Sequence, residues 1–137
     1  MGLTARNRRF FRYAERIAET SDFRRVHIGC VIVLGNKVVA STCNTEKGHP
    51  VQNEYNRYRG FYDGVGKLHA EIRALAQIKH LNLPSNKLEV YIWRCLKDGT
   101  LALARPCPAC RAALIDAGIR HIYYTDNGSF HYEEIEQ

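Results

Sequence analysis

Apolar residues near the start of the chain recur every three or four positions, and this spacing predicts an amphipathic helix over residues 3–19. Two apolar, β-branched runs follow at residues 26–34 and 37–43, and such runs are typical of strands. Gly35-Asn36 between them suits a two-residue hairpin turn, because both residue types tolerate positive φ. The first third of the chain thus predicts one helix followed by one hairpin.

Residues 44–66 break this pattern. Glycine, proline, asparagine, tyrosine and arginine are frequent in this stretch, and no helical or strand spacing persists through it. A loop of about 20 residues is uncommon in a compact domain and is usually functional or mobile. We therefore expect this segment to contribute to ligand specificity.

Regular spacing resumes after this loop. The remaining chain predicts a helix at 69–81, a strand at 88–95, a hairpin tip at 97–99, a helix from Pro106 to Gly118, and strands at 119–125 and 130–135. Helices that cross between strands favour an α/β sheet of about five strands with helices on its faces. The last two strands should form an antiparallel hairpin, because only residues 126–129 separate them.

Length and composition limit the class of protein. A chain of 137 residues with 45% hydrophobic and 25% charged residues is typical of one globular domain, here residues 1–137. No apolar run approaches the ~18–20 residues of a membrane span. The segment from Met1 to Arg12 carries arginines but no apolar region after them, so it does not resemble a secretion signal. We therefore expect a cytoplasmic protein without membrane partners.

Charge and cysteine content add two further constraints. The formal net charge of +6 favours anionic ligands such as nucleotides or nucleic acid, although a solvated basic surface explains it equally well. Five cysteines without an export signal indicate free thiols or metal ligands rather than a disulfide framework. Cys30 and Cys43 lie in apolar strand patterns and are predicted to be small core residues.

Two short segments at predicted helix starts carry residues suited to metal chemistry. Cys107 and Cys110 are three positions apart, so both thiols can face one point, and a helix N-terminus favours the thiolate form that binds metal. Zn²⁺ accepts two cysteine sulfurs and one imidazole, which His69 could supply. Three protein ligands leave a fourth position open, as in catalytic rather than structural zinc sites.

Glu71 lies two residues after His69, near enough to exchange protons with a water at such a site. Taken singly, these residues have plainer interpretations: a redox pair for the cysteines, a surface imidazole, and an acid favoured by the helix dipole. Three further residues could supply a fourth ligand but lack motif-like spacing: Cys95, His49 and His121. The combination of His-x-Glu with Pro-Cys-x-x-Cys is the pattern of zinc-dependent base deaminases.

His69-Ala70-Glu71 together with Pro106-Cys107-Pro108-Ala109-Cys110 resembles the cytidine and deoxycytidylate deaminase superfamily. The order of predicted elements is also similar, over nearly the whole chain. The resemblance implies a three-layer α/β/α fold with a central sheet of about five strands. It also implies that His69, Cys107 and Cys110 hold zinc and that Glu71 transfers protons.

The reaction implied by this resemblance is hydrolytic. Glu71 takes a proton from water and protonates N3 of cytosine, the oxygen adds to C4, and ammonia leaves. The resemblance further implies that Asn44, directly after the second strand, holds the sugar. The backbone N–H of Ala70 and the carbonyl of Pro106 would face the edge of the base.

Several substrates remain open. The leading hypothesis is a free nucleoside or nucleotide such as deoxycytidine or its monophosphate, and the alternative is single-stranded DNA or RNA. The alternative is favoured by the net charge and by cations and aromatics in the long loop: Lys47, His49, Gln52, Asn53, Tyr55, Arg57, Tyr58, Arg59, Phe61 and Tyr62. Adenine or guanine as the base, and a non-catalytic zinc or nucleic-acid-binding module, are further alternatives; Glu71 argues against the module.

Two features of the chain resemble different branches of the superfamily. His69 as the first ligand is similar to nucleotide, tRNA and polynucleotide deaminases, whereas the short connection at 126–129 is similar to nucleoside deaminases and several bacterial toxin deaminases. The compact chain resembles small deaminases of phages and bacteria, and the host-cell cytoplasm would be its location if a phage encodes it. Relatives often pair or form tetramers, so the resemblance also implies a homo-oligomer.

Overall fold

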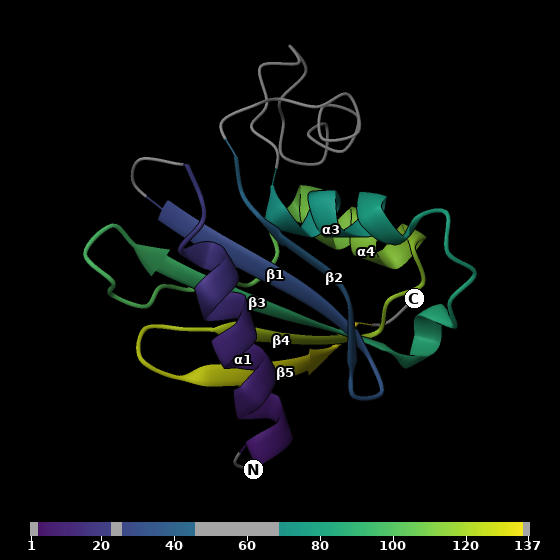
Figure 1. Ribbon diagram of the computed structural model, residues 1–137, viewed down its shortest axis with the longest axis horizontal. Coiled ribbons are helices and arrows are strands. Elements are labelled where there is room, and N and C mark those ends of the chain that lie inside the picture. Colours follow the sequence, from purple (N-terminus) through teal and green to yellow (C-terminus); the bar gives the residue numbers. More distant parts are fainter. Residues whose placement is uncertain (1–2, 23–25, 46–68, 136–137) are drawn as a thin grey trace.

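The computed structural model describes residues 3–22, 26–45 and 69–135. Its elements are α1 (Ala5–Ala18), β1 (Val26–Leu34), β2 (Lys37–Cys43), α3 (Ala70–Ile78), the 3₁₀ turn η2 (Ser85–Lys87), β3 (Leu88–Leu96), α4 (Pro108–Asp116), β4 (His121–Thr125) and β5 (Phe130–Glu134). The five strands form one sheet in the order β2-β1-β3-β4-β5. Helix α1 covers one face, and α3 and α4 lie together on the other (Figure 1). The predicted three-layer α/β/α arrangement is confirmed.

Strand directions follow from the connections. β1 pairs antiparallel with β2 and with β3, and the two-residue turn between β1 and β2 has positive φ at Gly35 alone. Glycine at the first central position is the preference of a type II′ hairpin turn. β3 and β4 run parallel because α4 crosses between them, whereas β4 and β5 pair antiparallel, as the short connection predicts. The predicted C-terminal hairpin is therefore confirmed.

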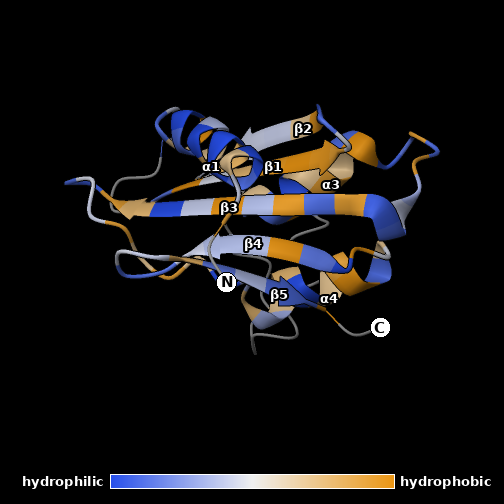
Figure 2. Ribbon diagram, turned by 90° about the horizontal axis from the view of Figure 1, so that it is seen from below, coloured by the Kyte–Doolittle hydropathy of each residue, from blue (hydrophilic) through white to orange (hydrophobic). Residues whose placement is uncertain are grey.

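Alternate residues of the central strands supply two separate cores. On the α3 and α4 side, Cys30 and Ile92 are fully buried, whereas Val31 and Tyr91 on the other side pack against Phe11 of α1. Figure 2 shows β1 largely in the colour of hydrophobic residues and much of α1 in that of hydrophilic ones. The sheet is thus apolar on both faces, as expected for a central sheet covered by helices.

Helix α1 begins at a capping box. The Thr4 hydroxyl accepts a hydrogen bond from the Asn7 N–H (3.1 Å), and the Asn7 side chain accepts one from the Thr4 N–H (3.1 Å). This cap places the first helical residue at Ala5, two positions later than the apolar spacing predicts. None of the described helices has the length and apolar character needed to cross a membrane.

The other differences from the predictions lie at two helix ends and at one cysteine. Helix α4 begins at Pro108, not Pro106, because Cys107 takes the extended N-cap conformation, and proline is well suited to the first helical position. Helix α3 ends at Ile78 rather than at residue 81. Cys43 is half-buried and accepts a hydrogen bond from the Thr20 hydroxyl (3.4 Å), so its prediction as a core residue is wrong. Cys30 is fully buried, as predicted.

Replacing Gly29 with alanine should destabilise the fold, because α1 lies directly on the backbone of β1 at this point. A Cβ at this position would lie 2.0 Å from the Ala14 carbonyl oxygen and 2.6 Å from the Ala18 nitrogen, both backbone atoms. We expect the free energy of unfolding to fall by about 1–3 kcal/mol or more, since overpacked sites force backbone shifts. Chemical denaturation measures this change. An unaltered denaturation midpoint would contradict the close backbone contact between α1 and β1.

Candidate functional site

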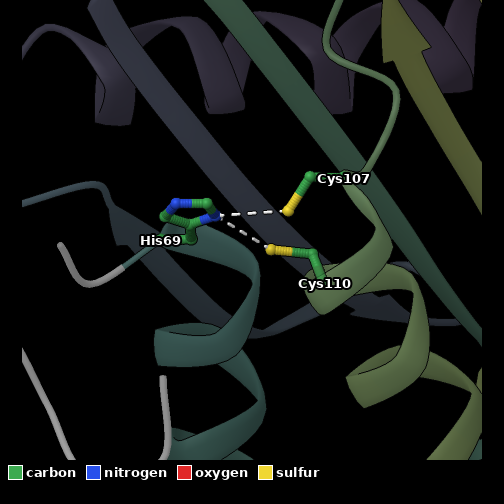
Figure 3. A group of neighbouring side chains, drawn as sticks. All are labelled: His69, Cys107 and Cys110. Carbon is green, nitrogen blue, oxygen red and sulfur yellow. Dashed lines mark hydrogen bonds between the residues drawn. The ribbon is translucent and has the colours of Figure 1, made fainter. Parts of the chain in front are cut away.

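The N-terminal ends of α3 and α4 bring together one imidazole and two thiols. His69 is the N-cap of α3, Cys107 is the N-cap of α4, and Cys110 lies in the first turn of α4. The His69 Nδ1 atom lies 3.2 Å from the Cys110 Sγ and 3.6 Å from the Cys107 Sγ (Figure 3). Among the described residues this is the one group of histidine, cysteine and acidic side chains whose ligand atoms converge, all within 4.8 Å of one another.

The two thiols have opposite acidities. A hydrogen bond from the Cys110 thiol lowers the pKa of Cys107 to about 4, and hydrogen bonding to His69 acts in the same direction. The same Cys110–Cys107 hydrogen bond, together with burial, raises the pKa of Cys110 well above its ordinary value. The low pKa of one sulfur is in line with the preference of a helix N-terminus for negative charge. A bound cation would have to displace the proton from the other.

Glu71 lies beside these thiols with a buried carboxyl group. Its side chain hydrogen bonds with Cys110, only 5% of the residue is exposed, and burial raises its pKa. In the described part of the chain, its Oε1 atom is buried without a hydrogen-bond partner. An unpartnered buried carboxylate oxygen is costly, so this atom needs a polar group that the described residues do not provide. The donor set and this oxygen fit a zinc ion with one position left for water.

Contacts with β2 hold α3 in place. The Thr42 hydroxyl donates to the Ala70 carbonyl oxygen (2.6 Å), and an Arg73 guanidinium nitrogen donates to the Cys43 carbonyl oxygen (3.1 Å). Both bonds connect the first turns of α3 to the end of β2. The position of His69 and Glu71 relative to the sheet is therefore fixed by polar contacts as well as by the apolar core.

Asn44 follows β2 directly and is buried, with 6% of its surface exposed. Its Nδ2 donates to the Val26 carbonyl oxygen (3.0 Å), and its Oδ1 accepts from the Ile28 N–H (3.0 Å) and from the Ser21 hydroxyl. Both ends of the amide thus hold the start of β1. The structure therefore shows that Asn44 stabilises the start of β1. Its predicted contact with a sugar stays a prediction.

The two predicted backbone contacts lie at the same helix starts. Ala70 is fully buried. Because it is the first residue of α3, its N–H has no partner within the helix. Pro106 is half-buried and directly precedes Cys107. Their predicted contacts with the edge of a base also stay predictions.

Replacing Asn44 with alanine should lower the stability of the fold. The change leaves the Ile28 N–H and the Val26 carbonyl without the partner that each has now, and an unsatisfied buried backbone group costs about 1–3 kcal/mol. Chemical denaturation should show a loss of this size, while the same replacement at the exposed Asn127 should leave stability nearly unchanged. Equal stability of both variants would contradict the role of the Asn44 amide.

The other candidates do not join this group or lie outside the described residues. Cys95 packs in the core on the α1 side of the sheet, and the His121 ring nitrogen Nδ1 hydrogen bonds with the Tyr132 hydroxyl (2.7 Å). The long loop from residue 46 onward lies outside the described residues, including His49 and the basic and aromatic side chains predicted to bind a ligand. Sequence reasoning missed Glu133 of β5, which bonds Arg105 and Arg111 on either side of the cysteine pair.

Comparisons with known proteins identify the family of this chain. The family model described as "Cytidine and deoxycytidylate deaminase zinc-binding region" matches residues 4–126. ComE operon protein 2 of Bacillus subtilis is 24% identical over 126 residues, which cover 91% of this chain. The chain spans 61% of the length of that curated relative.

Solved structures share the fold. The dCMP deaminase of cyanophage S-TIM5, in apo form, is 22% identical, with 89% of this chain and 84% of that chain covered and a TM-score of 0.60. The same enzyme has been solved in complex with dCMP and dUMP, with 90% and 83% covered, 22% identity and a TM-score of 0.60. Cytidine deaminase from Burkholderia pseudomallei is 17% identical, with 96% and 93% covered and a TM-score of 0.66.

Proposed function

The chain belongs to the cytidine and deoxycytidylate deaminase family, and on that premise we propose that it is a zinc-dependent hydrolytic deaminase of cytosine. Its substrate is a nucleoside or nucleotide such as deoxycytidine or dCMP, and its products are the uracil compound and ammonia. The observation that carries the proposal is the convergence of His69, Cys107 and Cys110 beside the buried carboxyl of Glu71. Three ligands with an adjacent proton acceptor are typical of a catalytic rather than a structural zinc site.

Zinc bound by His69, Cys107 and Cys110 would supply Lewis acidity that makes water more acidic at this point. Glu71 accepts a proton from the attacking water and delivers it to N3 of cytosine while the water oxygen bonds to C4. Glu71 then carries the second proton to the exocyclic amine, the C4–N bond breaks, and ammonia leaves. Burial raises the pKa of the Glu71 carboxyl, and a carboxyl with a raised pKa is a better proton acceptor than an exposed one, which suits such a carrier.

Other residues of the site would orient the base and sugar. We assign the Ala70 N–H and the Pro106 carbonyl to the edge of the base, since each adjoins a metal ligand in the chain. Asn44 would contact the sugar in addition to holding β1. The cyanophage enzyme that shares the fold was solved with dCMP and dUMP, which supports a nucleotide for this chain as well. The predicted cytoplasmic location and homo-oligomer stay predictions.

A second candidate is the same chemistry on single-stranded DNA or RNA. The net charge of +6 favours it, and Arg8, Arg9, Arg12 and Arg16 are all exposed on α1. A non-catalytic zinc module is disfavoured, because a structural site has no use for a buried carboxylate oxygen without a partner. Adenine or guanine as the base is a further alternative, since the zinc site is shared among such enzymes.

One assay compares these substrates. Zinc-loaded protein is incubated with cytidine, deoxycytidine, their monophosphates, a cytosine-containing oligonucleotide, adenosine and guanosine, and ammonia release is measured. We expect release from a cytosine nucleoside or monophosphate. Release from the oligonucleotide alone would favour the second candidate, release from a purine alone would change the base, and release from none would contradict the proposal.

A further inference from the structure

One carboxylate of the last strand collects four hydrogen bonds next to the start of α4. Glu133 accepts from the Arg105 Nε (3.1 Å) and Nη2 (3.0 Å) in a bidentate pair. An Arg111 guanidinium nitrogen donates to the Glu133 Oε1 (3.3 Å), which also accepts from the Arg105 Nη2. The Tyr124 hydroxyl donates to the Glu133 Oε2 (3.4 Å). We call these four residues the Glu133 clamp. Bidentate pairs of arginine and carboxylate are among the most directional polar contacts in proteins.

The clamp holds both ends of the cysteine pair. Arg105 precedes Cys107 by two positions, and Arg111 directly follows Cys110. Cys107 makes no side-chain cap of its own helix, so contacts from outside must fix the chain where α4 begins. The backbone contributes one such contact, from the Ala104 N–H to the Thr125 carbonyl oxygen (2.8 Å). Glu133 is a further contact from the sheet, and it reaches both sides of this segment.

The cluster lies at the surface. Arg105 and Arg111 are 54% and 38% exposed in their side chains, and exposed ion pairs contribute little to the free energy of unfolding unless they are bidentate or networked, so stability is measured alongside metal binding below. The match to the family ends at residue 126, before β5 begins, so it assigns no role to Glu133. Contacts just outside a metal site, however, often decide how tightly the metal is held, because they orient its ligands.

We propose that Glu133 is a positioning residue for the metal site. Through Arg105 and Arg111 it holds the backbone on both sides of the cysteine pair, so that both sulfurs meet the His69 Nδ1. The proposal rests on the proposed function, because it assumes that these three residues bind zinc. It adds to that function a residue of the C-terminal hairpin, far from the cysteines in sequence.

Charge and position predict the same direction of change when Glu133 is removed, so salt dependence is needed to separate them. Without its carboxylate, two guanidinium groups near the cysteines are no longer neutralised, and their positive charge opposes the binding of a cation. Loss of position loosens the ligands and also weakens binding. Salt screens the effect of exposed charge but not the loss of position, so faster zinc release should persist at high salt if Glu133 positions the cysteines.

The test uses the zinc-loaded full chain and its Glu133→Gln variant, with Glu134→Gln as a matched control. Glu134 is the next residue of the same strand and pairs with Arg120 (3.4 Å) instead of with the clamp. The measurement is the rate of zinc release to a chromogenic chelator. We expect Glu133→Gln to release zinc roughly 3- to 30-fold faster, below or within the 10–100-fold range for direct outer contacts. The control should match the wild-type chain.

Two further readouts separate positioning from general loosening. The absorption bands of the cobalt-substituted protein should shift in Glu133→Gln, whereas thermal unfolding of the metal-free protein should stay close to that of the control. In an Arg105→Gln, Arg111→Gln background, Glu133→Gln should have no further effect on zinc release, because Glu133 acts through these arginines.

Unchanged or slower zinc release in Glu133→Gln would overturn the proposal. Thermal unfolding of metal-free Glu133→Gln well below that of the metal-free Glu134→Gln control would also overturn it, because the faster release would then reflect a general loss of stability. A wild-type chain that binds no zinc would overturn the proposed function itself, and the clamp's role with it.

Discussion

Replacing Glu71 with glutamine should abolish turnover while leaving the fold and the metal in place. Glu71 is not among the three converging ligands, so zinc content should stay near that of the wild-type chain. Proton transfer by one general acid–base group contributes about 10²–10⁴-fold. Because one carboxyl serves both the water and the base, we expect a loss at or above the upper end of that range, about 10⁴-fold. Glutamine keeps the size of the side chain but cannot accept the proton.

The control for this variant is Glu134→Gln, which removes an exposed carboxylate on β5 that does not reach the site. It should retain full activity. Ammonia release, zinc content and thermal unfolding are measured for both proteins. If Glu71→Gln keeps zinc and most of its activity, Glu71 does not carry the protons and the proposed mechanism is wrong.

Replacing Cys110 with serine should remove the metal. Cys110 is fully buried, and its sulfur lies 3.2 Å from the His69 Nδ1. Among the described residues, His69, Cys107 and Cys110 are the one converging group of ligands, so no fourth side chain of the group can replace Cys110. Elemental analysis should find about one zinc per chain in the wild type and almost none in the variant, since a hydroxyl is a poor zinc ligand compared with a thiolate. Activity should be lost together with the metal.

Cys95→Ser is the matched control, because Cys95 is a half-buried thiol in the core on the α1 side of the sheet. It should keep zinc. Binding should also release protons and weaken as the pH falls, because the high pKa of Cys110 means that its proton must leave before the sulfur binds metal. Equal zinc content in Cys110→Ser and Cys95→Ser would contradict the ligand assignment.

Local sequence signals predicted most elements of the fold. The β-branched runs of β1 and β2 and the Gly35-Asn36 turn gave strand bounds that agree with the structure. Helix starts were less predictable, because the spacing of apolar residues does not specify which residue is the N-cap. The Thr4–Asn7 capping box and the extended conformation of Cys107 decided where α1 and α4 begin.

The site was predictable where it depends on short motifs and not where it depends on pairing across the sheet. Spacing indicated that Cys107 and Cys110 face one point, and the combination of two motifs at helix starts, with the family resemblance it carries, added His69 and Glu71. Glu133 reaches Arg105 only because β5 pairs with β4 in one register, and an isolated glutamate near the end of a chain carries no signal of that.

Asn44 shows a further limit of sequence reasoning. The family resemblance implied that Asn44, from its place after β2, contacts the sugar, but a single residue type does not reveal whether its amide is used by the fold. The structure shows that the amide bonds the backbone of Val26 and Ile28. A functional residue can have a structural role as well, and only variants measured for both stability and activity separate the two.

The proposed function requires that the chain hydrolyses the amino group of a cytosine nucleoside or nucleotide with water as the nucleophile. Deoxycytidine and dCMP are incubated with zinc-loaded protein in water enriched in heavy oxygen, and ammonia and the nucleoside or nucleotide product are quantified by mass spectrometry. We predict ammonia and a uracil product in equal amounts, with heavy oxygen at C4, and neither product with Glu71→Gln. Absence of ammonia from both substrates, or a uracil product without heavy oxygen at C4, would contradict the proposed function.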